Sequence, residues 1–264
     1  MNPPTFNPFF KDTISKLIKY YDYYNRHEFI EKDPISIPHL FKNEKDIEII
    51  GFLVALITWG KRETVIKSAK QLVFLMENHP YDFIMNFNKN SLLLNKFVHR
   101  TFNMDDLKSI LSILKILYKN GSSLRLLFEN YIHPNDQHVG KGIIELRNYF
   151  IKNGLEKRTF RFFPDIEKGS AAKRINMFLR WMVRKDERGV DFGIWKGIKT
   201  SQLLIPLDVH TGRIAREWGL LKRKSNDFKA VLELTNNLKI IDPIDPIKFD
   251  YALFGAGIYK NQSL

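Results

Sequence analysis

The segment 205–220, IPLDVHTGRIAREWGL, places an aspartate directly before a short helical pattern that contains a histidine and arginines. A carboxylate at a helix start accepts backbone N–H groups, and the positive end of the helix dipole favours its ionised form. Asp208 is therefore either a helix cap alone or a carboxylate positioned to act on a bound group. His210 and Arg213 follow on the same helix, which favours a negatively charged ligand.

Lys173 is the second residue with candidate chemistry, because it follows a turn containing Gly169 and stands at the start of a predicted helix. An ammonium group is disfavoured at this end of a helix, which favours the neutral amine that a nucleophile requires. A nearby carboxylate would orient such an amine and stabilise positive charge on a sugar-like carbon. An ordinary surface lysine is the simpler alternative. Lys196 and Lys199 lie nearer to Asp208 in the sequence and compete for the role.

The turn before Lys173 and the helix after it indicate phosphate binding. Backbone N–H groups of a glycine turn, here those of Gly169 and Ser170, are suited to an anion. Basic and polar residues recur on one face of the predicted helix from about Ala171 to Arg184, and this spacing predicts a solvated cationic stripe. The stripe consists of Lys173, Asn176, Arg180 and Arg184.

The composition describes a globular protein with a strong positive charge. Of the 264 residues, 44% are hydrophobic and 27% are charged. Lys and Arg number 42 against 29 Asp and Glu, a formal net charge of +13. Such a charge favours a polyanionic partner, most often a nucleic acid, through neutralisation of phosphates. Scattered surface lysines without a common partner are the alternative.

Several classes of protein are excluded by what the sequence lacks. There is no cysteine, which excludes disulfides, iron–sulfur clusters and cysteine-based zinc sites and fits a reducing cytoplasm. The N-terminal residues do not form a signal peptide, and no apolar run approaches membrane-spanning length. Asp242, Asp245 and Asp250 are expected to start turns and a helix rather than to bind a metal. We therefore expect a cytoplasmic protein without metal or cofactor.

Helical periodicity predominates along the chain. The pattern from about Asp46 to Thr58 is apolar on nearly every face, which predicts the most buried helix. A glycine turn at residues 59–62 joins it to a second helix that runs to about Asn78. A clear amphipathic helix ends before Gly121. No period-two alternation is long enough to build a sheet, so residues 1–264 are predicted to form one all-α unit.

Two of these segments resemble a known superfamily. GSAAKRINMFLRW followed by IPLDVHTGRIAREWGL resembles the helix–hairpin–helix DNA glycosylases, and NMFLRW resembles the archaeal 8-oxoguanine glycosylase branch. In this resemblance Gly169 is the first hairpin glycine and Lys173 is the lysine that forms a Schiff base. The family segment P-x-D-x-H-x-x-R, which contains the catalytic aspartate, is matched by Pro206, Asp208, His210 and Arg213.

Over nearly the whole chain, the sequence looks like a bacterial family of unknown function, DUF2400, notably in FLRWMVRKDERGVDFGIW and DPIDPIKFDYALFGAG. Three features depart from the glycosylase pattern. Ala171 replaces the second hairpin glycine, and 35 residues separate Lys173 from Asp208, a longer interval than usual. The early turn contains Lys61 and Arg62 where many relatives carry a small polar residue.

The resemblance implies an all-α fold of two helical lobes with a cleft between them. It also implies a monomeric DNA-repair glycosylase with lyase activity on double-stranded DNA, acting on a flipped damaged base such as 8-oxoguanine. Lys173 would attack C1′, and Asp208 would assist its deprotonation and stabilise the oxocarbenium-like state. The DNA contacts would come from Lys61, Arg62, Gly169, Ser170, Arg174, Arg180, His210 and Arg213. The alternatives are a non-catalytic nucleic-acid-binding protein on this scaffold, or an unrelated helical protein.

Overall fold

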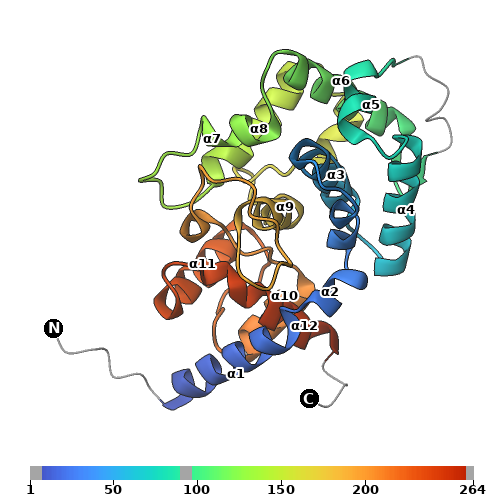
Figure 1. Ribbon diagram of the computed structural model, residues 1–264. Coiled ribbons are helices and arrows are strands. Elements are labelled where there is room, and N and C mark those ends of the chain that lie inside the picture. Colours follow the sequence, from blue (N-terminus) through green and yellow to red (C-terminus); the bar gives the residue numbers. More distant parts are fainter. Residues whose placement is uncertain (1–7, 90–96, 260–264) are drawn as a thin grey trace.

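The computed structural model describes residues 8–89 and 97–259, which are mostly helical (Figure 1), as the all-α prediction requires. The α-helices are α1 (Pro8–Tyr24), α2 (His27–Glu31), α3 (Glu44–Ile57), α4 (Arg62–Leu75), α5 (Pro80–Asn86), α6 (Met104–Lys119), α7 (Leu124–Glu129), α8 (Gly140–Lys152), α9 (Lys173–Val183), α10 (Val209–Glu217), α11 (Phe228–Ile241) and α12 (Asp250–Tyr259). Short 3-10 helices are η1 (Pro34–Ser36), η2 (Pro38–Leu40), η4 (Lys157–Phe162), η5 (Thr200–Gln202) and η6 (Pro246–Phe249). Two antiparallel two-residue strands, β1 (Val98–His99) and β2 (Phe102–Asn103), complete the described elements.

Helix α3 is buried along most of its length, which confirms the prediction made from its apolar pattern. It begins two residues earlier than expected, because the side chain of Asn43 accepts a hydrogen bond from the N–H of Lys45 at 2.9 Å and caps the helix. Continuous burial from Ile47 to Ile57 makes α3 a central packing surface for its neighbours.

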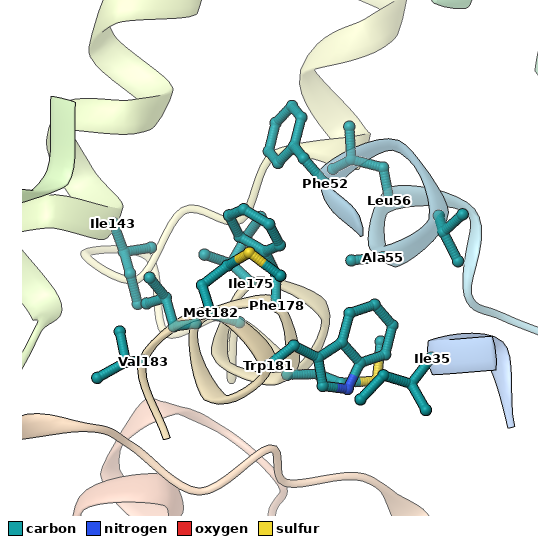
Figure 2. Close-up of a cluster of buried hydrophobic side chains, with 14 of the residues drawn as sticks. Ile35, Phe52, Ala55, Leu56, Ile143, Ile175, Phe178, Trp181, Met182 and Val183 are labelled. Atoms are coloured by element: carbon teal, nitrogen blue, oxygen red, sulfur yellow. The ribbon is translucent and has the colours of Figure 1, made fainter. Parts of the chain in front are cut away.

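Helix α9 packs closely on α3. Figure 2 shows Ile175, Phe178, Trp181 and Met182 directed from α9 into a cluster that includes side chains of α3 and α8. Gly51 of α3 permits this approach, because a Cβ atom there would lie 3.3 Å from Cε of Met182. The first half of the chain is thereby joined to α9 by apolar contacts.

The helices gather in two groups on either side of α9 (Figure 1). One group contains α3–α8, and the other contains α1, α10, α11 and α12. In the second group Tyr24 of α1 packs so closely on Gly255 of α12 that a Cβ atom would lie 2.2 Å from its ring. The expected division into two lobes with a cleft between them stays a prediction.

Helix α9 starts at Lys173 rather than at the predicted Ala171, because Ala172 adopts a left-handed conformation with φ of 50°. This conformation is disfavoured for any residue with a Cβ atom. It ends the turn that begins at Gly169 and places Lys173 in the first helical position. Across the described ranges, no helix is both long and apolar enough to span a bilayer.

Candidate functional site

Lys173 lies half-buried at the N-terminal end of α9. Its Nζ atom donates to the Sδ atom of Met177 at 3.5 Å and lies 6.0 Å from the ring centroid of Phe254 in α12. A thioether is a weak acceptor. Lys173 forms no ion pair with any described residue, and the thioether is a weak partner for its amine.

Asp208 is the N-cap of α10, as predicted. Its Oδ1 atom accepts hydrogen bonds from the N–H groups of His210 and Thr211, both at 2.9 Å. The preceding residues 203–207 are buried, and the side chain of Asn226 donates to the backbone carbonyl of Asp208 at 3.1 Å. These contacts hold a half-buried carboxylate rigidly at the helix start, and Oδ2 forms no hydrogen bond with a described residue.

The buried carboxyl group of Asp250, at the start of α12, connects Lys173 and Asp208. Burial raises the pKa of Asp250 to about 6. The charges of Arg180 and Lys173 oppose that shift, and the charge of Asp208 adds to it. Lys173 and Asp208 therefore both lie within electrostatic range of one carboxyl group, although 35 residues separate them in the sequence.

Asp33 and Arg62 extend this cluster toward the first half of the chain. Asp33 is buried, and its Oδ1 atom caps η1 by accepting the N–H of Ile35 at 3.1 Å. Burial raises the pKa of Asp33, and the charges of Arg62, Arg180 and Lys173 oppose the shift. Arg62 lies with its Cζ atom 5.4 Å from the Phe254 ring centroid. Two predicted cations, Arg62 and Lys173, thus meet at one aromatic ring.

Lys61, by contrast, is exposed at the N-terminal end of α4, beside Gly60. Gly60 has φ of 99°, a left-handed conformation that favours glycine. The turn therefore directs Arg62 toward the cluster and leaves Lys61 on the surface.

Two N–H groups of the glycine turn before α9 donate hydrogen bonds to carbonyl groups of the same turn. The N–H of Gly169 donates to the carbonyl of Ile166, and that of Ser170 donates to the carbonyl of Asp165, both at 3.0 Å. The carbonyl of Gly169 accepts the N–H of Phe228 at 3.0 Å. In the described structure both N–H groups are therefore occupied by carbonyls of the same turn, and their predicted contact with a phosphate stays a prediction.

Arg180 is buried and paired with carboxylates, and its predicted contact with a phosphate stays a prediction. The predicted solvated stripe is wrong, since Asn176, Arg180 and Arg184 are 1%, 4% and 0% exposed. Arg180 pairs with Asp191 at 3.2 Å and with Asp250, and Arg184 pairs with Asp191 at 3.0 Å. Acidic groups from the loop after α9 and from α12 cover this face of α9, which compensates the cost of burying the guanidinium groups.

The guanidinium group of Arg174 donates hydrogen bonds to two backbone carbonyls. Its Nη1 atom donates to the carbonyl of Leu56 at 2.6 Å, and Nη2 donates to that of Phe162 at 3.3 Å. Its Cζ atom lies 5.1 Å from the centroid of Trp59, and burial lowers its pKa to about 10. Arg174 therefore anchors the start of α9 to the end of α3, and its predicted contact with DNA stays a prediction.

His210 and Arg213 are exposed on α10 beside the end of α12. A Cβ atom on Gly257 would lie 2.9 Å from Cβ of His210, so the two backbones approach closely. Arg213 donates from Nη2 to the carbonyl of Gly257 at 2.8 Å and lies 4.0 Å from Glu217. Both predicted DNA-binding side chains are accessible, on the helix that Asp208 caps.

The two competing lysines lie on the loop that follows α9 and have other partners. The Nζ atom of Lys196 donates to the carbonyl of Gly193, and that of Lys199 donates to the carbonyl of Pro134 at 3.0 Å. Lys173, in contrast to these two lysines, is among the charges that shift the pKa of Asp250. The structure therefore brings Lys173 near the carboxylates and ties Lys196 and Lys199 to backbone elsewhere.

Asp33, Asp250 and Phe254 were not predicted as site residues. Asp33 precedes a proline and Asp250 precedes an apolar helix, so local patterns explain both residues as a turn and a helix start. Only the fold places them around Lys173. No group of three His, Asp or Glu residues within ranges 8–89 and 97–259 is arranged to hold a metal ion.

The sequence pattern of one protein family matches residues 33–259, which is most of the chain. That family is described as "Protein of unknown function (DUF2400)". No curated protein and no solved structure matches the chain.

Proposed function

Since the chain belongs to the DUF2400 family, whose description names no activity, its function has to be inferred from the site, and we propose that it is a DNA-repair glycosylase with β-lyase activity. Its substrate would be a damaged base flipped out of double-stranded DNA, an oxidised purine such as 8-oxoguanine. The protein would act as a monomer without a cofactor. The proposal includes a helix–hairpin–helix glycosylase fold, in which the turn at Gly169 and helix α9 form the hairpin motif.

One observation carries the proposal. The amine of Lys173 and the carboxylate of Asp208 lie at two helix starts, and both act on the buried carboxyl group of Asp250. An amine and a carboxylate in one neighbourhood are the pair that Schiff-base chemistry at a sugar carbon requires. Motifs around both residues resemble those of the glycosylase superfamily.

The reaction uses each group in a defined way. The neutral amine of Lys173 attacks C1′ of the damaged nucleotide, the C1′–N bond breaks, and its electron pair leaves with the base. Asp208 stabilises the positive charge that develops on the sugar during this step. The attached amine then loses a proton to solvent, and the C1′–O4′ bond breaks with its electron pair going to O4′, which leaves a Schiff base. Removal of a C2′ proton from the Schiff base eliminates the 3′ phosphate by breaking the C3′–O bond. Asp208 keeps its orientation throughout, because two N–H groups hold Oδ1.

The positive charge supports the choice of DNA as a substrate. The net charge of +13 favours a polyanion, and Lys61, His210 and Arg213 are exposed around the cluster. Arg62 is half-buried at the cluster itself. In the proposal these four side chains contact phosphates, and Arg174 and Arg180 position α9 instead.

A non-catalytic nucleic-acid-binding protein is the second candidate. The observation in its favour is that Lys173 contacts a thioether and Asp208 contacts backbone N–H groups, so neither touches the other in the described structure. Such a protein would bind duplex DNA through the same basic surface without forming a covalent intermediate.

Borohydride trapping on a duplex with one abasic site separates the two candidates. The wild type is expected to form a covalent protein–DNA adduct, and Lys173→Gln is expected to lose it while remaining folded. Lys196→Gln and Lys199→Gln are matched controls, because both lysines lie on the neighbouring loop and donate to carbonyls. An adduct that survives in Lys173→Gln and disappears in a control would refute the assignment. A wild type that binds the duplex but never traps would support the non-catalytic protein.

A further inference from the structure

Asp250 has one carboxylate oxygen that the fold does not use. The residue is 4% exposed at the first position of α12, and its Oδ2 atom accepts a hydrogen bond from Nη1 of Arg180. Its Oδ1 atom is buried and has no hydrogen-bond partner among the described residues. A buried acceptor without a partner costs about 1–3 kcal/mol, so such an atom requires an explanation, for example a role in catalysis.

The charged groups that act on Asp250 come from helix α9 and from the start of α10. Arg180 and Lys173 belong to α9, and Asp208 caps α10. Helix α1 packs on α12 through Tyr24, whose ring lies against Gly255, and Lys248 of η6 is paired with Asp242. Burial raises the pKa of Asp250 to about 6, with Asp208 adding to the shift and the two cations opposing it. The carboxyl group therefore exchanges its proton close to neutral pH.

Asp208 and Asp250 have opposite environments within one site. Asp208 is half-buried, and two backbone N–H groups stabilise its Oδ1 atom. Asp250 is buried with an unused oxygen. When the surroundings of two carboxyl groups in one active site differ in this way, one commonly acts as an ionised carboxylate and the other as a proton donor.

The position of Asp250 relative to the nucleophile fits such an acid. Nζ of Lys173 lies 6.0 Å from the Phe254 ring centroid, and Phe254 is one helical turn after Asp250 on the same face of α12. The sugar carbon that Lys173 attacks would therefore lie at this end of α12.

Building on the proposed glycosylase function, we propose that Asp250 is the general acid of the site and that its Oδ1 atom delivers a proton to the departing base. The O–H bond on Oδ1 breaks, and the proton moves to a nitrogen of the base as that base takes the electron pair of the C1′–N bond. Asp250 remains as a carboxylate paired with Arg180, and solvent returns the proton after the products leave. Lys173 keeps its role as the nucleophile.

The test separates base release from strand cleavage, because a preformed abasic site has no base to protonate. Asp250→Asn keeps the size and an acceptor for Arg180 but cannot deliver the proton. We expect its single-turnover base release to fall by about 10²–10⁴-fold, while its lyase rate on abasic DNA falls far less, because an abasic site has no base to protonate. Wild-type base release should decline as pH rises above about 6, and the variant should lack that decline. Asp245→Asn is the matched control, because it removes a carboxylate that pairs with Arg184 at 2.9 Å in the adjacent ion-pair network.

Each of the other possible results would refute one specific part of the proposal. Equal losses of base release and lyase rate in Asp250→Asn would assign Asp250 a structural role. A wild type that cleaves abasic DNA but releases no base from a panel of damaged duplexes would overturn the general acid and leave the lyase intact. A wild type inactive in both assays would overturn the glycosylase itself. Independently of activity, the carbon-13 carboxyl signal that Asp250→Asn removes must titrate near pH 6, and titration near 3.8 would overturn the proposal.

Discussion

Replacement of Asp208 by asparagine separates a helix cap from a catalytic carboxylate. In the structure Oδ1 of Asp208 accepts two N–H groups at 2.9 Å, and an asparagine oxygen can accept both. Asparagine caps helices about as well as aspartate, whereas alanine at an N-cap costs about 0.5–2 kcal/mol. We therefore expect Asp208→Asn to change the free energy of unfolding by less than about 0.5 kcal/mol, a Tm shift of about 1–2 °C for a chain of this size.

The activity of Asp208→Asn should change far more than its stability. If the carboxylate stabilises positive charge on the sugar, its removal should lower the single-turnover rate by about 10²–10³-fold, as the loss of one preorganised electrostatic group does elsewhere. The assay is strand cleavage of an abasic duplex with enzyme in excess, together with borohydride trapping. Binding to the duplex should not weaken, because one negative charge near the phosphates is removed.

Asp208→Ala completes the comparison, because it removes both the cap and the charge. It should lose about 1 kcal/mol of stability and show the same low rate as Asp208→Asn. Wild-type rates in both variants, with a loss of stability in Asp208→Ala alone, would refute the catalytic role and leave Asp208 as a helix cap.

Three further outcomes are expected. Affinity for an undamaged duplex should fall by orders of magnitude between 50 and 200 mM salt if several phosphates are neutralised, and a flat response in a fluorescence anisotropy titration would contradict DNA binding. Arg180→Met should lower the free energy of unfolding by about 3–5 kcal/mol in chemical denaturation, because it leaves the buried carboxylates of Asp191 and Asp250 without their partner. Burial raises the pKa of Asp250 above its ordinary 3.8 to about 6, so the folded chain binds this proton more tightly than the unfolded chain. The stability that this proton contributes is complete below about pH 4 and is lost as pH rises through about 6, and denaturation at both pH values should show this loss in the wild type but not in Asp250→Asn.

Local sequence patterns were sufficient to predict the features that depend on near neighbours in the chain. The apolar run of α3 predicted its burial, because a helix that is apolar on every face has to be surrounded by other elements. The aspartate before VHTGRIARE predicted the cap of α10, because the N–H groups that Asp208 satisfies belong to the next three residues. The glycine turn predicted that Lys173 would stand at a helix start, and the structure differs only in placing the left-handed residue at Ala172.

Features that depend on distant partners could not be predicted in the same way. The face of α9 that contains Arg180 and Arg184 was expected in solvent, since three- and four-residue spacing identifies a polar face but not what covers it. Asp191 comes from the following loop and Asp250 from the last described helix, and their charges allow both arginines to be buried. The same packing brings Lys173 into electrostatic range of Asp33 and Asp250, and Asp208 into range of Asp250. Contacts between residues so far apart in the chain leave no periodic signal in the sequence, which is why this cluster could not be predicted.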